Sequence, residues 1–484
     1  MPQANTNTQP PRIPLILDPE NRYNTTNQDA RLVNAYMESA DRLTKQYHLY
    51  KRPGYGSQQQ VGTSTAAGMG TYTWNGNVYS IFAGILYKNG TQVATGLDTS
   101  NGVYSFNEIK GSDPKIVMQN GVQGYAYDDT ALLSSPLYVT SGNIYPQYTV
   151  KGIAYLDGET YVMQRFFGTQ NTPAVIWGSA VNSVTGPTDW DPLDFITAQI
   201  EPDYPVALNK QLSYVIAFKQ WTTEVFFDAG NATGSPLQSV PGSKARFGCA
   251  HQDSVQRIED VLFWLSTNQS ASLQVCMMEN LQVGVISSVA VDRLLNNANL
   301  SGGVYSWQLK VDGHLFYILT IVSANLTLAY DVIEKGWAQW TDTNGNYVPI
   351  CSSTYDASGH KVIQHATNGC LYYMDSAYIY GDDNGSNMPV QIITPIFDAG
   401  TRRNKFLSML EIIGDKQVGN YLTVQVSDDD YNTWSQPRRV DMGYDRMLLP
   451  DCGTFRRRAW WIQYNQYGPL RLSGMEPQFD LGVL

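Results

Sequence analysis

Charged residues are scarce in this chain of 484 residues: Asp, Glu, Lys and Arg together make up 15%, against about 25% in typical soluble proteins. The low charge, together with 32 Tyr and 41 Gly, favours β-sheet and argues against a helical bundle or coiled coil. No apolar run approaches the ~18 residues of a membrane-spanning helix. The opening MPQANTNTQPPR lacks the charged and apolar regions of a secretory signal, so we expect a protein made in the cytoplasm, without membrane insertion.

Basic residues are outnumbered, with 32 Lys and Arg against 43 Asp and Glu and a net charge of −11. This balance disfavours a protein that grips nucleic acid over a large surface, because such proteins carry basic faces. It does not exclude a protein that lets nucleic acid pass without holding it. From residue 395 onward 11 basic and 11 acidic residues cancel, so the whole excess of acid lies upstream.

Cysteine pairs and catalytic motifs are also missing. The five cysteines are widely spaced and form no CxxC pair, so neither a disulfide framework nor a zinc ribbon is indicated. No GxSxG elbow, phosphate-binding loop or HExxH motif occurs. We therefore assign no catalytic, cofactor-binding or metal-ligating residue, and expect a protein that is not an enzyme.

Neighbouring carboxylates are the remaining candidates for chemistry. Paired carboxylates can hydrolyse glycosides when they face each other across a cleft, but adjacent residues on a turn point in different directions. We expect the acidic clusters to be solvated loop tips, and the sequence DDNGSN at 382–387 lacks the frame of an EF-hand. The clusters are Asp128-Asp129, Asp382-Asp383 and Asp428-Asp429-Asp430.

A strand–turn–strand rhythm begins at about Met69. Apolar and polar residues alternate between Asn-Gly and Asp-Gly dipeptides, which favour type I′ hairpin turns. These units recur every 40 to 50 residues or so, the spacing of β-propeller blades. We predict an all-β fold with a propeller of six or seven blades at 67–395; a chain of small sandwiches is the alternative. The dipeptides are Asn75-Gly76, Asn89-Gly90, Asn120-Gly121 and Asp157-Gly158.

The two flanks differ from this central region. Residues 1–66 are rich in Asn, Thr, Gln and Pro and too polar to form a core, so we predict an extended arm that lies on its own chain or on a neighbouring subunit. Within it, 29–50 could form one short helix or two extended pieces. Residues 396–484 have longer strands and denser charge, and we predict a separate β-sandwich-like module there.

One hairpin in the C-terminal module has a known pattern. Ser427, Asp429, Thr433 and Trp434 match S-x-D-x-G-x-T-W, with Tyr431 in place of the glycine. The match resembles the Asp-box hairpins of sialidases, in which the carboxylate accepts backbone N–H groups and the Trp packs beneath the turn. A single imperfect copy predicts a structural hairpin. It also raises the alternative function, a carbohydrate-binding or sialidase-like glycosidase propeller.

Three consecutive arginines, Arg456, Arg457 and Arg458, precede a Trp pair. Arginine beside Trp can stack on bases, but alternation in a strand places Arg457 on the opposite face from the other two. We expect these arginines to make packing or subunit contacts rather than contacts with nucleic acid.

The order of these parts resembles a known family. The segment LVNAYMES at 32–39, the turn KRPGYG at 51–56, the propeller and the C-terminal β module are similar to the tail accessory proteins of short-tailed bacteriophages. These are the packaged-DNA stabilisation proteins, or tail nozzles. The residues that match the family's opening motifs are Asn34, Tyr36, Arg52, Pro53 and Gly54.

The resemblance implies a structural protein of the virion tail, with no catalytic residues. It implies a hexameric ring beneath the portal and adaptor that retains the packaged genome and forms its exit channel. DNA passing through would make only weak, non-specific contact. We expect the five matching residues to make assembly contacts with neighbouring chains or with the adaptor.

Overall fold

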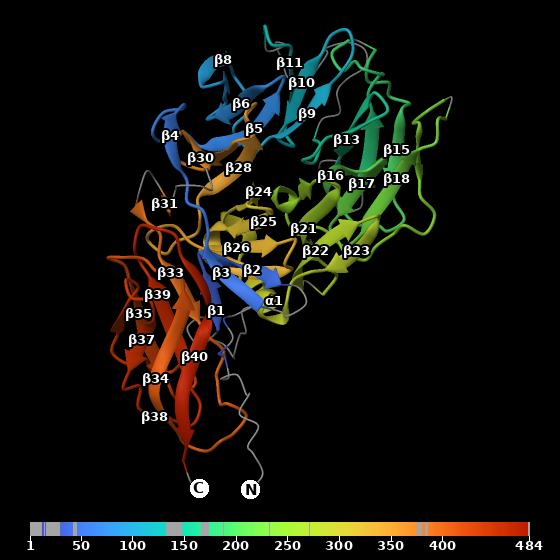
Figure 1. Ribbon diagram of the computed structural model, residues 1–484. Helices are drawn as coiled ribbons and strands as arrows, with labels where there is room; N and C mark the ends of the chain where they lie inside the picture. Colours follow the sequence, from blue (N-terminus) through green and yellow to red (C-terminus); the bar gives the residue numbers. More distant parts are fainter. Residues whose placement is uncertain are drawn as a thin grey trace.

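The computed structural model describes residues 12–13, 15, 30–41, 46–131, 148–165, 174–186, 188–231, 233–270, 272–374, 380–382 and 386–482. Nearly every element in these residues is a β-strand. The exceptions are one α-helix, α1 (Val289–Asn296), and the short 3₁₀ helices Gln252–Ser254, Leu300–Gly302 and Val322–Ala324. Figure 1 shows two bodies, a ring of small sheets above and a sandwich of the N-terminal and C-terminal strands below.

The upper body is a β-propeller with seven blades, within the range that the sequence predicts. Each blade is an antiparallel sheet whose first strand lies nearest the ring axis. Blades one to four consist of β5 (Gly68–Trp74), β6 (Asn77–Phe82), β7 (Ile85–Lys88) and β8 (Thr91–Thr95); β9 (Ser105–Ile109), β10 (Lys115–Gln119) and β11 (Gly124–Tyr127); β12 (Ala154–Leu156), β13 (Glu159–Gln164), β14 (Ala174–Gly178) and β15 (Phe195–Ala198); and β16 (Pro205–Gln211), β17 (Tyr214–Lys219), β18 (Thr223–Asp228) and β19 (Leu237–Ser239).

Blades five to seven complete the ring, and the last of them takes its outermost strand from the N-terminal segment. These blades consist of β20 (Gln256–Ile258), β21 (Val261–Thr267), β22 (Leu273–Glu279) and β23 (Gln282–Val285); β24 (Val304–Val311), β25 (His314–Ile321), β26 (Leu326–Asp331) and β27 (Gly336–Trp340); and β28 (Ile350–Tyr355), β29 (Lys361–His365), β30 (Cys370–Met374) and β4 (Gly56–Gln60).

The hairpin dipeptides account for several of the turns within blades. In Asn75-Gly76, Asn89-Gly90 and Asp157-Gly158 both residues have positive φ, as a type I′ turn requires. In Asn120-Gly121 only the glycine does, and the turn there is held instead by the Asn120 side chain, which accepts hydrogen bonds from the backbone N–H groups of Val122 and Gln123. Three of the four predicted turns therefore have the expected backbone.

The lower body is a sandwich of two sheets. One sheet has the strand order β2 (Ala35–Asp41), β3 (Gln46–Lys51), β40 (Arg471–Leu481), β34 (Lys405–Gly414) and β37 (Met447–Pro450), with β38 (Thr454–Phe455) beside β34. The other contains β1 (Arg31–Val33), β33 (Val390–Ile393), β39 (Ala459–Tyr464), β35 (Tyr421–Ser427) and β36 (Arg438–Asp441). A small hairpin, β31 (Gly381–Asp382) with β32 (Ser386–Asn387), precedes β33.

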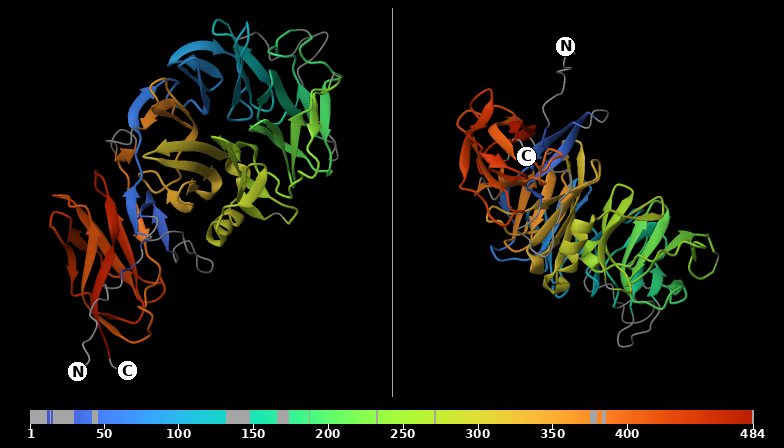
Figure 2. Two further views of the ribbon diagram at one scale, coloured as in Figure 1. Left: turned by 45° about the vertical axis from the view of Figure 1, so that its right-hand side comes forward. Right: turned by 90° about the horizontal axis from the view of Figure 1, so that it is seen from below.

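A single sheet joins the two bodies. β1 pairs in parallel with β27, the outer strand of blade six, and antiparallel with β33 of the sandwich. The result is a nine-stranded sheet that runs from the propeller axis into the sandwich. Trp307 and Trp340 of blade six share one buried cluster with Leu422 and Trp460 of the sandwich. The two bodies, seen from two further sides in Figure 2, therefore have a common core.

The N-terminal segment is part of this framework rather than an arm beside it. For the stretch 29–50 the sequence allows one short helix or two extended pieces. The structure has the extended form, because β2 and β3 pair there as antiparallel strands. β4 pairs with β30 and closes the ring. The strands β1 to β4 thus lie on their own chain, one of the two expected places. Both predicted domain boundaries separate strands that pair with each other. The boundary at 66 separates β4 from its partner β30. The boundary at 396 assigns β33 to the propeller, although β33 pairs with β39 of the sandwich.

Candidate functional site

Asn34 lies between β1 and β2, where the propeller meets the sandwich. It has a φ of 56°, a conformation that Asn tolerates better than most residues. Its side-chain Nδ2 donates to Thr341 Oγ1 and Pro389 O, both at 2.8 Å. Its Oδ1 accepts from Arg52 Nε at 2.9 Å and from the Thr341 backbone N–H at 2.8 Å. The fully buried amide therefore uses both donors and both acceptor positions.

Arg52 is the centre of this junction. Only 1% of the residue is exposed, and its guanidinium makes a two-pronged ion pair with Asp382, with Nη2–Oδ2 at 2.6 Å and Nη1–Oδ1 at 3.2 Å. The other donors reach Asn34, Pro53 O and Thr341 O, so all five guanidinium N–H groups have acceptors. Burial raises the pKa of Asp382, and the Arg52 guanidinium opposes that rise.

The other matched residues fit around the same point. A Cβ on Gly54 would lie 2.1 Å from the Gly381 carbonyl oxygen, so only glycine fits there. Tyr36 packs edge-on against His314 and Phe316 of blade six, with ring centroids 4.8 and 5.5 Å apart.

The structure thus brings together all five residues that match the family's opening, but inside the chain. Asn34, Tyr36, Arg52, Pro53 and Gly54 are all buried, and the contacts described above are with residues of the same chain. These side chains hold the junction within the chain, and the expected contacts with neighbouring chains or the adaptor stay a prediction.

The prediction for Asp382 is wrong. The sequence predicts a solvated loop tip, but the residue is fully buried. Its partner is 330 residues away, so no local signal could have indicated the pair. Asp383 lies outside the described residues. Asp128 and Asp129 are exposed or half-buried on a turn as expected; Asp128 accepts N–H groups of its own turn, and Asp129 pairs with Lys88.

A second candidate site is the central pocket of the propeller, with a volume of about 550 Å³. All seven innermost strands line it. The turn 251–254 closes one end by reaching other blades: Lys151 Nζ contacts Asp253 Oδ1 at 2.6 Å, Ser306 Oγ donates to Asp253 O at 2.7 Å, and Gln252 Nε2 donates to Asn101 Oδ1 at 3.3 Å. No sequence motif indicated this pocket, because its lining residues are spread over all seven innermost strands.

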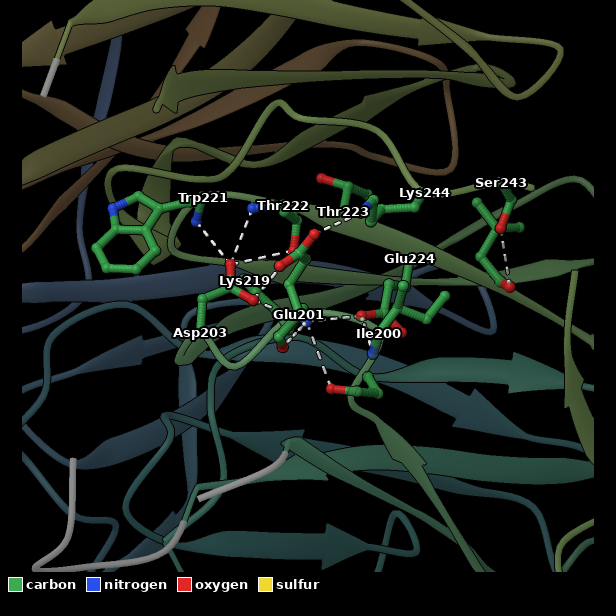
Figure 3. A network of polar contacts seen from close by, with 12 residues as sticks. Ile200, Glu201, Asp203, Lys219, Trp221, Thr222, Thr223, Glu224, Ser243 and Lys244 are labelled. Carbon is green, nitrogen blue, oxygen red and sulfur yellow. Dashed lines mark hydrogen bonds and ion pairs between the residues drawn. The ribbon is translucent and has the colours of Figure 1, made fainter. Parts of the chain in front are cut away.

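A buried polar network braces the segment that leads to this turn (Figure 3). Lys219 Nζ lies between Asp203 Oδ1 at 2.7 Å and Glu224 Oε1 at 2.6 Å, and all three side chains are at most 1% exposed. Asp203 also accepts the backbone N–H groups of Trp221 and Thr222, both at 2.9 Å. The Cys249 N–H then donates to Lys219 O at 2.8 Å. The network therefore connects blade four to the chain that closes the pocket.

The Asp-box-like hairpin lies in the sandwich, after β35, and not in a propeller blade. Asp429 accepts from the Thr433 backbone N–H at 2.9 Å and from its hydroxyl at 2.6 Å, and Ser427 Oγ donates to Asp429 at 2.8 Å. The bond from the Thr433 hydroxyl is the main reason why the pKa of Asp429 falls to about 2. Trp434 packs against Trp461, and Tyr431 has the positive φ of the glycine it replaces.

The arginine run makes contacts within the sandwich. Arg458 is 3% exposed and forms a two-pronged ion pair with Asp428 at 2.6 and 2.7 Å. Arg457 pairs with Asp430, and Arg456 Nε donates to Asn404 at 3.1 Å. Arg456 and Arg457 remain exposed.

Over the described ranges, no group of three or more His, Cys, Asp or Glu residues is placed to hold a metal ion. The same residues contain no helix long and apolar enough to cross a membrane. All five cysteines are free thiols. Cys452 is half-buried, and the four buried ones are Cys249, Cys276, Cys351 and Cys370.

Comparisons with solved structures return chains of low similarity. The extracellular domains of two putative hybrid two-component systems of B. thetaiotaomicron have 8% and 10% identity and TM-scores of 0.42 and 0.44; the matches cover 82% and 95% of this chain but only 47% and 62% of those chains. The WD40 beta propeller domain of Doa1 has 11% identity and a TM-score of 0.32, over 66% of this chain and 97% of that one. A search of curated proteins found no match.

The comparison with protein families is more specific. The Phage_stabilise family, described as "Bacteriophage P22 Gp10, beta-propeller", matches residues 12–376. The match covers the N-terminal strands, the junction residues Asn34 to Gly54 and all seven blades. The chain therefore belongs to the family of bacteriophage P22 Gp10, the phage tail proteins that stabilise packaged DNA, which implies a structural rather than an enzymatic protein located in the virion tail.

Proposed function

We propose that six copies of this chain form a nozzle ring below the tail adaptor, and that the ring retains the packaged genome and becomes its exit channel. Family membership supports a role in holding packaged DNA. The observation that carries the proposal is the size of the propeller's own central pocket. It limits where DNA can pass.

DNA cannot pass through the propeller of a single chain. The central pocket has a volume of about 550 Å³, and the turn 251–254 closes one end. A DNA duplex, whose major groove alone is ~12 Å wide, does not fit such a space. A DNA channel built from this protein must therefore lie between several copies, and a closed ring is the symmetric way to make one.

The fused shape of the chain suits a ring subunit. The nine-stranded sheet and the shared core join the propeller to the sandwich, and the buried Arg52–Asp382 pair lies at the same junction. A subunit whose two bodies share one sheet and one core can transmit the load of a pressurised genome from one contact surface to the next.

The charge distribution suits a channel that releases DNA quickly. Each phosphate neutralised by a basic side chain adds affinity with a steep salt dependence, which would slow ejection. The net charge of −11 lies entirely upstream of residue 395. We predict that the surface facing the ring axis is acidic or neutral, and that free protein binds duplex DNA no more tightly than the non-specific range of ~10⁻⁴ M at physiological salt.

The proposal is tested by size-exclusion chromatography with light scattering, followed by electron microscopy of the purified protein with and without the adaptor. We expect a species of six times the 53.9 kDa chain mass and rings with a central opening. A protein that stays monomeric at high concentration and in the presence of the adaptor would contradict the proposal of a ring of six copies.

A further inference from the structure

Two cations from neighbouring blades line the central pocket. Lys210 lies near the end of the inner strand of blade four, and Arg257 is on the inner strand of blade five; both line the pocket. Burial lowers the pKa of Lys210, Arg257 lowers it further, and Asp157, outside the pocket lining, opposes the shift. Two like charges held close together are unfavourable unless an anion joins them.

The acidic side chains of the pocket do not fill that role. Among the described residues, Glu108 pairs with Lys110 at 3.0 Å and Asp253 pairs with Lys151 at 2.6 Å. Neither Lys210 nor Arg257 forms an ion pair within the described part of the chain. The pocket therefore has local positive charge in a chain that is acidic overall.

The remaining wall is aromatic and polar. Tyr72 and Phe106 stack with ring centroids 5.6 Å apart, and Tyr155 and Tyr355 also line the pocket. Amide and hydroxyl side chains line the pocket as well. Asn107 is one of them, and its buried Nδ2 has no acceptor among the described residues. A buried amide donor without an acceptor is uncommon in native proteins, and a ligand oxygen in the pocket would satisfy it.

We infer that the central pocket of the propeller binds an acidic saccharide, a sugar ring bearing a carboxylate or a phosphate. Lys210 and Arg257 would hold the anionic group with charge-assisted hydrogen bonds. The amide and hydroxyl groups would bind the sugar hydroxyls, while the aromatic rings pack against its C–H surface. The volume of about 550 Å³ lies within the range of small-ligand sites, ~300–1,000 Å³. The inference is independent of the proposed ring.

The experiment is isothermal titration calorimetry of the full chain with four probes: glucuronic acid, glucose 6-phosphate, glucose and inorganic phosphate. We expect one or both acidic sugars to bind at one site per chain, and glucose and phosphate to bind at least ~10-fold more weakly. The two acidic sugars distinguish a carboxylate from a phosphate. The inference of a saccharide ligand would be wrong if inorganic phosphate bound as tightly as the acidic sugars, or if neither acidic sugar bound.

Substitutions locate the site. Arg257→Gln and Lys210→Gln remove one charge each without a large change in shape, and each should weaken binding ~10-fold or more, since hydrogen bonds to a charged group are stronger than those to a neutral group. The matched control is Lys310→Gln, a basic residue of blade six outside the pocket lining that lies 3.6 Å from Glu259. Its affinity should be unchanged. If the control loses as much affinity as the pocket variants, the binding is non-specific and the inference fails.

Discussion

The junction and the central pocket both contain arginines near aromatic rings, but the arginines have opposite surroundings. At the junction, Arg52 is 1% exposed and every guanidinium donor has an acceptor in the chain. In the pocket, Arg257 is exposed, lies near Lys210 and has no ion pair in the described residues. A fully satisfied buried charge holds two parts of a fold together. A charge that lines a cavity without an ion-pair partner is available to bind a ligand.

The largest effect should come from breaking the junction pair. Arg52→Met leaves Asp382 buried without a counter-charge, and we expect the free energy of unfolding to fall by ~3–5 kcal/mol. Urea unfolding followed by Trp fluorescence measures it. The double variant Arg52→Met, Asp382→Leu removes both charges and should recover a large part of the loss. A single variant as stable as the parent would show that the pair does not hold the junction.

A smaller loss is expected from Gly54→Ala. The new Cβ would lie 2.1 Å from the backbone oxygen of Gly381, and overpacking of this kind typically costs ~1–3 kcal/mol. Gly284→Ala in blade five is the matched control, since nothing lies within 4 Å of its added Cβ and it should change stability little. Equal melting temperatures for the two variants would contradict the tight packing at the junction.

Lys361 extends the comparison to a buried cation without an ion partner in the described part of the chain. Its Nζ has no hydrogen-bond acceptor among the described residues and lies 3.9 Å from the centroid of the Tyr355 ring. Burial lowers its pKa to about 7. Below pH 7 the folded protein must keep a buried charge, so Lys361→Met should raise the free energy of unfolding there by ~1–3 kcal/mol.

The gain from Lys361→Met should shrink as the pH rises from 7 towards the ordinary lysine pKa of about 10.4, because the folded state then holds a neutral amine while the unfolded state still binds the proton. Urea unfolding of parent and variant at pH 6, 8 and 9.5 measures the difference. A gain that is constant with pH would show that packing, not charge, is responsible.

The smallest effect on stability is expected in the pocket. Lys210→Gln and Arg257→Gln remove cations that support no described ion pair, so the free energy of unfolding should change by less than ~0.5 kcal/mol or rise slightly as the repulsion is relieved. Thermal unfolding without ligand is the measurement. A loss as large as that of Arg52→Met would remove the contrast between the two regions.

Much of the fold was accessible from the sequence because its signals are local. The alternation of apolar and polar residues, the Asn-Gly and Asp-Gly turns and the spacing of the units all predict a propeller. The opening motif around Asn34 and Arg52 also indicated the family. The prediction of an N-terminal arm was less accurate. A strand such as β4 can be identified only from its pairing with β30, some 310 residues away, which no local signal indicates.

The candidate sites could not be predicted to the same extent. Each blade contributes a few pocket residues at positions that look like any polar residue on a half-buried strand, and Asp382 looked like a loop tip. The role of the motif residues was also out of reach, since burial depends on what packs over them.

The sequence by itself determined the all-β class, the propeller and the family, because hairpin turns and strand alternation depend on residues close together in the chain. Only the tertiary structure decided that β4 closes the ring, that β1 carries the sheet of blade six into the sandwich, and that Arg52 is buried against Asp382. Only the closed ring placed Lys210 and Arg257 at one pocket. These outcomes depend on contacts between distant segments, and such contacts form only when the loop-closure entropy of the whole chain is offset by a shared core.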